Sequence, residues 1–194
     1  NVIKPIHPRG EYLRFNWNAG IGINPFDKKT IYYGSQYLHK SSDHGKSWEI
    51  ISPDLTTNDT SKQHFLESGG LSYDATGAEN HTTIISVEPS SLEEGLIWVG
   101  TDDGKVQLTR NEGESWEDLT SNIKGVPANN WVSHIEASKH QAGEAFIVFD
   151  DHRRNNWDAY VYRTQNYGKT WERIVDNDDV RGFAYCITQD PVEP

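Results

Sequence analysis

The chain has 194 residues, of which 35% are hydrophobic and 11% aromatic, which is enough apolar material to build a packed core. Lys and Arg number 18 against 29 Asp and Glu, and the resulting net charge of −11 argues against nucleic acid as a partner. No apolar run approaches the roughly 20 residues that a membrane helix requires, so no membrane insertion is expected.

Three parts of the chain each predict four short strands. In chain order the runs are GIGINP, TIYYGS, YLHKSS and SWEIIS, then TIISVEP, LIWVGT, KVQLTR and SWEDLT, and last VSHIEAS, EAFIVFD, AYVYRT and TWERIV. They are rich in Ile, Val, Tyr, Trp and Thr and are bounded by Gly, Pro, Asp and Asn. Because they show almost no helical period, each run is interpreted as a strand.

Four antiparallel strands in each repeated unit are typical of a propeller blade. We therefore expect an all-β fold, a β-propeller fragment of about three four-stranded antiparallel blades. The blades are expected at about 17–52, 82–120 and 131–175. A next blade is expected to start at 182–191, because RGFAYCITQDP repeats the apolar run that ends in INP and VEP in the first two units. Residues 1–194 would then all be part of one propeller domain.

An octapeptide is repeated at the turn that follows the third strand of each unit. It reads SSDHGKSW at 41–48, TRNEGESW at 109–116 and TQNYGKTW at 164–171. The glycine is expected to take the positive φ of a tight turn, the short side chain two places before it to accept hydrogen bonds from the turn, and the Trp to bury its ring between blades. A structural role is expected for Ser41, Asp43, Gly45, Trp48, Asn111, Gly113, Trp116, Asn166, Gly168 and Trp171.

These octapeptides resemble the Asp box, or BNR repeat, of sialidases, xyloglucanase-type glycosidases and sortilin-like propellers, whose pattern is S-x-D-x-G-x-T-W. The first copy differs only in Ser47, whereas the other two carry Asn in place of Asp. The segments NWNAG, ISPDLT, IWVGTDDGKV and DDHR resemble bacterial sortilin-like BNR-repeat propeller proteins, which are often labelled glycosyl hydrolases. The resemblance implies that the boxes lie away from the ligand face, and it implies a secreted, periplasmic or cell-surface location.

Candidate catalytic residues lie in the loops between second and third strands, which gather opposite the octapeptides in a propeller. Two neighbouring units place acid pairs at equivalent positions there, Asp102 with Asp103 and Asp150 with Asp151. Carboxylates that face each other can divide into an acid of raised pKa and an ionised base, as glycoside hydrolysis requires. The alternative for Asp102 and Asp103 is that, with Gly104, they simply form a hairpin turn.

The loop that carries Asp150 and Asp151 is longer than a turn requires. It continues as HRRNNWDA and therefore offers side chains suited to ligand binding. Arginine and aromatic side chains commonly anchor bound partners. The candidate ligand-binding residues are His152, Arg153, Arg154 and Trp157 from this loop and Arg181 from the next connection.

No cofactor and no metal site is expected. The histidines show no paired metal-ligand spacing, and the chain contains neither an HExxH motif nor a cysteine cluster. The lone Cys186 lies in an apolar run and is interpreted as a buried small hydrophobe. The long connection at 53–81 is either a functional cover or a disordered excursion, and the sequence leaves both alternatives open.

Two functions of different classes remain open. The first is a binding scaffold that holds a protein, peptide or glycan ligand on the loop face, and the second is a glycoside hydrolase of the xyloglucanase type, which the resemblance implies. The expected partner is the remainder of the propeller, in the same or another chain, because a ring closes only when its last blade packs on its first. Since Asn1 is not an initiator residue and CITQDPVEP stops one strand into a blade, we expect an excerpt of a longer propeller.

Overall fold

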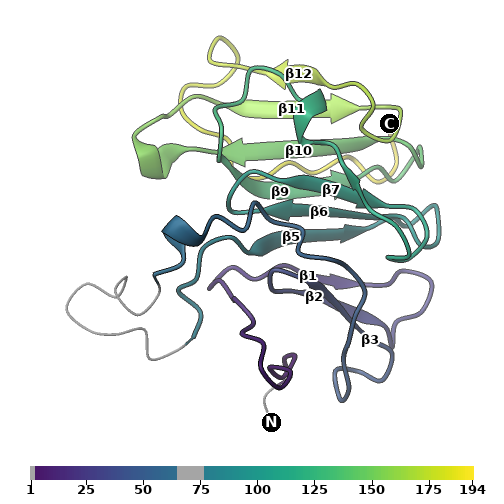
Figure 1. The fold of residues 1–194 in the computed structure, drawn as a ribbon. Coiled ribbons are helices and arrows are strands. Elements are labelled where there is room, and N and C mark those ends of the chain that lie inside the picture. Colours follow the sequence, from purple (N-terminus) through teal and green to yellow (C-terminus); the bar gives the residue numbers. More distant parts are fainter. Residues whose placement is uncertain (1–2, 65–76) are drawn as a thin grey trace.

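The computed structural model describes residues 3–64 and 77–194, which form three four-stranded antiparallel sheets of consecutive strands (Figure 1). The prediction of an all-β fold with three four-stranded units is therefore confirmed. The first sheet contains β1 (Ile21–Ile23), β2 (Ile31–Gly34), β3 (Leu38–Ser41) and β4 (Glu49–Ile50). The second contains β5 (Ile84–Pro89), β6 (Ile97–Thr101), β7 (Val106–Thr109) and β8 (Glu117–Asp118). The third contains β9 (Trp131–Ala137), β10 (Ala145–Asp150), β11 (Tyr160–Thr164) and β12 (Glu172–Val175).

Helical structure in the described residues is limited to short 3₁₀ turns. These are η1 (Thr60–Lys62), η3 (Thr120–Asn122) and η4 (His152–Arg154), each of 3 residues. Within residues 3–64 and 77–194, no helix has the length and apolar character needed to cross a membrane. The structure thus agrees with the lack of helical period in the sequence.

The three sheets lie side by side, and their first strands are neighbours (Figure 1). The strand β5 contacts both β1 and β9. One apolar cluster, which includes Tyr32, Leu38 and Ile97, fills the seam between the first and second sheets. A larger cluster, which includes Trp98 and Ile147, fills the seam between the second and third sheets. Because burial of apolar surface contributes about 25 cal/mol per Å², these two seams hold the stack of sheets together.

Each octapeptide forms the turn between the third and fourth strands of its sheet and satisfies its own backbone donors. The hydroxyl at its first place accepts the glycine amide: Ser41 from Gly45 at 2.8 Å, Thr109 from Gly113 at 2.9 Å and Thr164 from Gly168 at 3.0 Å. The residue at its third place accepts the amide at the seventh: Asp43 from Ser47 at 2.9 Å, Asn111 from Ser115 at 3.0 Å and Asn166 from Thr170 at 2.9 Å. The turn therefore needs no acceptor from elsewhere in the chain for these amides.

The change from Asp to Asn in the second and third boxes reverses one hydrogen bond. In the first box the Ser47 hydroxyl donates to the Asp43 carboxylate at 2.7 Å. In the second box the side-chain amide of Asn111 donates to the Ser115 hydroxyl at 2.9 Å, and Asn166 makes the same contact in the third box at 2.8 Å. Because a hydroxyl can donate or accept, all three boxes close the same contact.

The box turns also pack against the preceding part of the chain. Each box glycine faces an aliphatic residue: Ile3 beside Gly45, Ile51 beside Gly113 and Leu119 beside Gly168. A Cβ added to Gly113, whose φ is 97°, would lie 2.3 Å from the Ile51 carbonyl oxygen. The turn thus requires glycine for its backbone angle and for this close approach. In the first sheet the N-terminal segment takes the place that the end of a fourth strand takes against the other two boxes.

The box tryptophans are only half-buried, and two of the three lie at the seams between sheets. Trp116 packs against the cluster between the first and second sheets, and its Nε1 donates to the Ile51 carbonyl at 3.1 Å. Trp171 packs against the cluster between the second and third sheets. Trp48 packs edge-on against Tyr33 of its own sheet, with ring centroids 5.9 Å apart. Two of the three rings therefore join neighbouring sheets, while each ring keeps part of its surface in solvent.

The strand expected within 182–191 does not form a ladder. Residues 183–190 belong to no helix or strand and lie beside β9, where for example the Ser133 hydroxyl donates to the Tyr185 carbonyl at 3.0 Å. A strand requires a neighbour whose backbone groups match it in register, whereas this contact with β9 is made through a side chain. Cys186, which we expected to be buried, is exposed. A segment outside any sheet is not covered on both faces, and this accounts for the difference.

Replacing Gly113 by Ala should destabilise the chain by about 3 kcal/mol or more, because the methyl group adds a clash with the Ile51 carbonyl to the cost of a positive φ. The matched control is Gly10→Ala, since Gly10 also has a positive φ of 85° but open space around it. The control should cost only about 1 kcal/mol. Urea denaturation of both variants measures the difference, and equal losses would show that the box turn does not press against the preceding strand.

Replacing Trp116 by Ala should cost about 2–3 kcal/mol in the free energy of unfolding. This is less than the about 3–5 kcal/mol of a fully buried ring, because part of the indole is in solvent. Trp17, which is 66% exposed, provides the control, and Trp17→Ala should change stability by no more than about 0.5 kcal/mol. A loss below about 1 kcal/mol for Trp116→Ala would contradict its role as an anchor of the seam.

Candidate functional site

The two edges of the sheets carry different loops. On one edge, the box turns bond to the loops between first and second strands: the amides of His44, Glu112 and Tyr167 donate to the carbonyls of Lys29, Gly95 and Gly143. On the other edge, the loops between second and third strands meet the connections between sheets. There the Leu55 amide donates to the Gln36 carbonyl and the Asp102 amide to the Thr83 carbonyl. We call this second edge the loop edge.

A pocket of about 350 Å³ opens at the loop edge, and we call it the loop-edge pocket. Its residues come from η1, from His81 shortly before β5, from the start of β9 and the residues before it, and from the end of β10 with the loop that follows. Its size lies within the range typical of small-ligand sites. The residues that line it are Lys62, His81, Asn129, Trp131, Asp150, Asp151, Arg153 and Arg154.

The two acids of this pocket are buried and bound to cationic groups. Asp150 is 1% exposed and Asp151 is 5% exposed. The carboxylate of Asp150 lies 2.6 Å from His152 Nδ1 and accepts a hydrogen bond from Arg153 at 2.8 Å. The carboxylate of Asp151 accepts a hydrogen bond from Arg154. The acids thus form the floor of the pocket, and their oxygens are already engaged.

The single turn of η4 places the two arginines above these acids. Asp150 pairs with Arg153 and Asp151 with Arg154, so that each pair is three residues apart, a spacing that one 3₁₀ turn brings to the same side. The guanidinium carbon of Arg153 lies 3.8 Å from the centre of the Trp131 ring. Each arginine is therefore held by a charge beneath it, and Arg153 also by an aromatic face.

His152 and Trp157 lie in a different cluster. Their rings contact Phe183, with centroids 4.6 Å from His152 and 5.6 Å from Trp157. Neither is among the described residues that line the loop-edge pocket, and the same holds for Arg181, which is exposed. The structure therefore brings Arg153 and Arg154 together in the pocket and places His152 and Trp157 in an aromatic cluster.

The other acid pair ties the connection between the first and second sheets to the second sheet. Asp102 is 0% exposed and accepts the Thr83 amide at 2.8 Å and the Thr83 hydroxyl at 2.7 Å. Asp103 is 2% exposed and accepts the Thr57 amide at 2.7 Å and the Thr57 hydroxyl at 2.6 Å. Gly104 follows with a φ of 89°. This geometry favours the turn alternative for Asp102 and Asp103 and adds a linking role between sheets.

His81 links these buried acids to the loop-edge pocket. Its Nδ1 lies 3.4 Å from a carboxylate oxygen of Asp102. Burial of the imidazole opposes its protonation, but the hydrogen bond and the charge of Asp102 outweigh burial and raise the pKa of His81 above its usual value. His81 is therefore protonated more readily than an unperturbed imidazole and can add a positive charge to the pocket.

Sequence reasoning did not single out Lys62, His81, Asn129 or Trp131 as parts of a site. Lys62 and His81 flank residues 65–76, which lie outside the described residues, so the choice between a cover and a disordered excursion is not decided for that stretch. Trp131 could have been noticed, because it is a large aromatic residue directly after a blade-to-blade connection. Its neighbours in space come from segments far apart in the chain, and no local pattern reports such a meeting.

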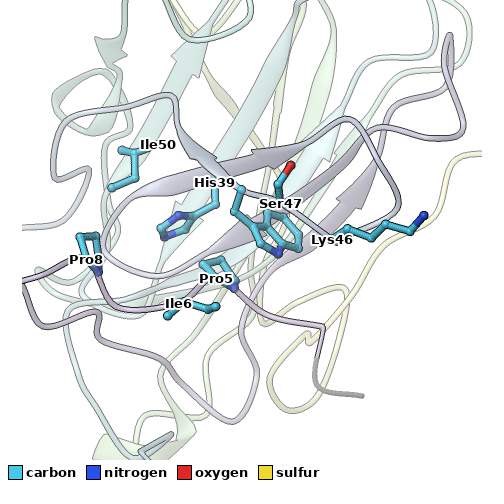
Figure 2. Close-up of a pocket in the computed structure, with 8 residues that line it drawn as sticks. Pro5, Ile6, Pro8, His39, Lys46, Ser47 and Ile50 are labelled. Carbon is cyan, nitrogen blue, oxygen red and sulfur yellow. The ribbon is translucent and has the colours of Figure 1, made fainter.

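A second pocket, of about 390 Å³, lies between the N-terminal segment and the first sheet. Figure 2 shows Pro5, Ile6 and Pro8 on one side and His39 and Ile50 on the other. Burial lowers the pKa of His39 to about 4, so this ring is neutral near pH 7. This pocket thus offers mainly apolar contacts. None of the candidate catalytic or ligand-binding residues lines it.

The groups that the loop-edge pocket presents are mainly hydrogen-bond donors with positive charge. The guanidinium and ammonium groups donate only, and the acids beneath them have their oxygens engaged. Among the residues that the structure describes, no group of three or more His, Cys, Asp or Glu lies close enough to hold a metal ion. Such an arrangement is suited to binding a ligand that carries acceptor oxygens.

The fold and its turns define the class of the protein as three successive blades of a β-propeller with Asp-box turns. No family model matches the chain. Two curated relatives are fungal. The chain is 27% identical over 174 residues to a probable oligoxyloglucan-reducing end-specific xyloglucanase of Neosartorya fischeri, a match that covers 79% of this chain and 21% of that protein. It is 33% identical over 99 residues to an oligoxyloglucan-reducing end-specific xyloglucanase of Emericella nidulans, covering 50% of this chain and 12% of that protein.

Solved structures show the same fold at low sequence identity. An ancestral GH74 enzyme matches 83% of this chain and 19% of its own, with a TM-score of 0.50 and 17% identity. YCF48 from Cyanidioschyzon merolae matches 87% of this chain and 39% of its own, with a TM-score of 0.53 and 15% identity. YCF48 bound to D1 peptide matches 95% and 48%, with a TM-score of 0.50 and 14% identity. The chain thus spans about a fifth or less of the curated relatives it matches.

A pH titration should show the coupling of His81 to Asp102. The pKa of His81 is raised in the folded state, so the stabilisation by its protonated form is fully present below about pH 6.5 and is lost as the pH rises through the folded pKa. NMR should place the His81 midpoint above 6.5. In Asp102→Asn the midpoint should fall, because burial then acts without the compensating charge. An unchanged midpoint would contradict the coupling.

Proposed function

We propose that this chain is the ligand-binding part of a propeller and that it binds a glycan, or else a peptide, in the loop-edge pocket. The observation that carries this proposal is that the acids of the pocket are buried, whereas its cations and its aromatic ring face the ligand. The carboxylates of Asp150 and Asp151 are buried and engaged, while Arg153, Arg154 and Trp131 offer donors and an aromatic surface to a ligand. Such groups anchor ligands through hydrogen bonds and stacking.

The similar proteins support a glycan as the first ligand to test. Both curated relatives are named as xyloglucanases that act at the reducing end of oligoxyloglucan. A peptide is the second ligand, since one structure with the same fold is that of YCF48 bound to D1 peptide. The chain matches only a minor part of each curated relative. That a longer protein containing this chain would bind the same ligand is therefore also part of the proposal.

Hydrolysis of a glycosidic bond is the alternative function, and its support is the same pair of curated relatives. A general acid must reach the leaving oxygen, and a general base or nucleophile must reach water or the sugar. Asp150 and Asp151 have side chains that are 0% and 6% exposed and are bound to arginine. Asp102 and Asp103 are buried and bound to threonine groups. This geometry favours binding over catalysis by these four residues.

The proposed setting of the site is a complete propeller ring outside the cytoplasm. The remaining blades would come from the same or another chain, and the location would be secreted, periplasmic or on the cell surface. The support for the ring is exposed apolar surface on the first sheet: Ile21 and Ile23 of β1 are each 59% exposed, on the opposite side of the strand from Gly22, which faces the second sheet. Contiguous exposed apolar surface is often covered by a partner.

Calorimetric titration tests the proposal with a panel of neutral oligosaccharides derived from xyloglucan, acidic oligosaccharides and unstructured peptides. At least one glycan should bind, and Trp131→Ala should weaken that binding by roughly tenfold, because it removes the aromatic surface and loosens Arg153. Trp17→Ala, which changes a tryptophan that is 66% exposed, is the control and should bind as the unchanged chain does.

Two results would decide against the proposal. If no glycan or peptide binds, or if Trp131→Ala binds as tightly as the unchanged chain, the loop-edge pocket is not the ligand site. If xyloglucan oligosaccharides release new reducing ends, and Asp150→Asn and Asp151→Asn abolish that release while binding persists, the alternative of a glycoside hydrolase replaces it.

A further inference from the structure

The loop-edge pocket exposes cationic side chains, although the chain as a whole is acidic. The chain carries a net charge of −11. At this pocket, however, the side chains of Arg153 and Arg154 are 40% and 47% exposed, while their partners Asp150 and Asp151 are 0% and 6% exposed. Lys62 adds a third cation with a side chain that is 39% exposed. The exposed charged groups that line the pocket are therefore cations. Each is paired with an acid: Arg153 and Arg154 with the buried Asp150 and Asp151, and Lys62 with Asp59, which is itself partly exposed and does not line the pocket.

The buried acids hold the two arginines in place before any ligand arrives. Arg153 donates to Asp150 at 2.8 Å and is stacked on Trp131 at 3.8 Å. Arg154 donates to the Ala128 carbonyl at 2.9 Å as well as to Asp151. Guanidinium groups that are fixed in this way lose little freedom when they bind, and their planar forks match the geometry of an oxyanion. The pocket is thus preorganised for a group with two acceptor oxygens.

The net charge of the chain restricts what that group can belong to. A nucleic acid or another dense polyanion would be repelled by the surrounding surface at distances within the Debye length of about 8 Å. A ligand with isolated carboxylates would feel the local cations without that long-range cost. Trp131 also lines the pocket. Arg153 covers one face of its ring, and a sugar ring can pack its apolar face against the aromatic surface that remains.

From these contacts we infer that the loop-edge pocket recognises an acidic sugar, a uronic acid within a glycan, with the carboxylate bound by Arg153, Arg154 and Lys62 and the sugar ring packed on Trp131. This inference rests on the proposed function, because it assigns a ligand class to the same pocket. It adds that negative charge on the glycan, rather than a neutral sugar alone, is what the pocket selects.

The test compares two probes that differ only at their carboxyl groups, trigalacturonic acid and its neutral methyl ester, by calorimetric titration of the chain 1–194 at low salt. The acid should bind, and the ester should bind roughly tenfold or more weakly, because esterification removes the charge-assisted hydrogen bonds. Raising the salt concentration should weaken binding of the acid and leave binding of the ester nearly unchanged.

A variant that leaves the buried pairs intact identifies the site. Lys62→Gln removes an exposed cation whose recorded partner is the exposed Asp59, so the fold should be kept. It should weaken binding of the acid by roughly threefold to tenfold and leave binding of the ester unchanged. Lys169→Gln is the matched control, because it makes the same change of charge at an exposed position in the third Asp box. It should alter neither affinity.

Several outcomes would overturn the inference and separate it from the proposed function. If acid and ester bind equally, or if a neutral oligosaccharide derived from xyloglucan binds more tightly than the acid, the chain binds glycans but does not select charge. If triglutamate binds more tightly than trigalacturonic acid, the carboxylate partner is a peptide. If Lys62→Gln and Lys169→Gln have equal effects, general electrostatics and not the pocket governs binding. If none of the probes binds, both proposals fall.

Discussion

The contact that the second and third Asp-box turns make with the end of the preceding unit is the constraint on which the remaining structure depends. Ile51 against Gly113 and Leu119 against Gly168 fix how closely successive sheets approach. The apolar seams can close only at that spacing, since interiors pack at nearly crystalline density. The same spacing brings the connections between sheets and the loop after β10 to one place, and the loop-edge pocket is the result.

The buried acids connect this architecture to function. Asp102 and Asp103 use their oxygens to fasten the connection between two sheets, whereas Asp150 and Asp151 use theirs to orient two arginines. Acids at equivalent positions thus stabilise a connection in the second blade and orient exposed arginines in the third. Burying an ionised carboxylate is costly unless it is paired, so each acid requires the partners that surround it.

The repeated strand runs and the octapeptide were sufficient to predict the fold, because alternation, turn residues and a repeat are properties of local sequence. The sequence also named Arg153 and Arg154 as ligand candidates, since their loop exceeds what a turn needs, and both line the loop-edge pocket. Lys62, His81 and Trp131 line the same pocket but were not named, because these residues come from connections that are far apart in the chain. The strand expected within 182–191 shows that a local pattern can also predict too much. An apolar run forms a strand only when a neighbouring strand offers matching backbone groups.

A crystal structure of the chain with trigalacturonic acid bound tests the central claim most directly. The account predicts the sugar in the loop-edge pocket, packed on Trp131, with its carboxylate within hydrogen-bond distance of Arg153 or Arg154 and with both acids still paired beneath. The sugar in the pocket beside His39, or a carboxylate of Asp150 or Asp151 turned out of its arginine pair toward a glycosidic oxygen, would contradict it.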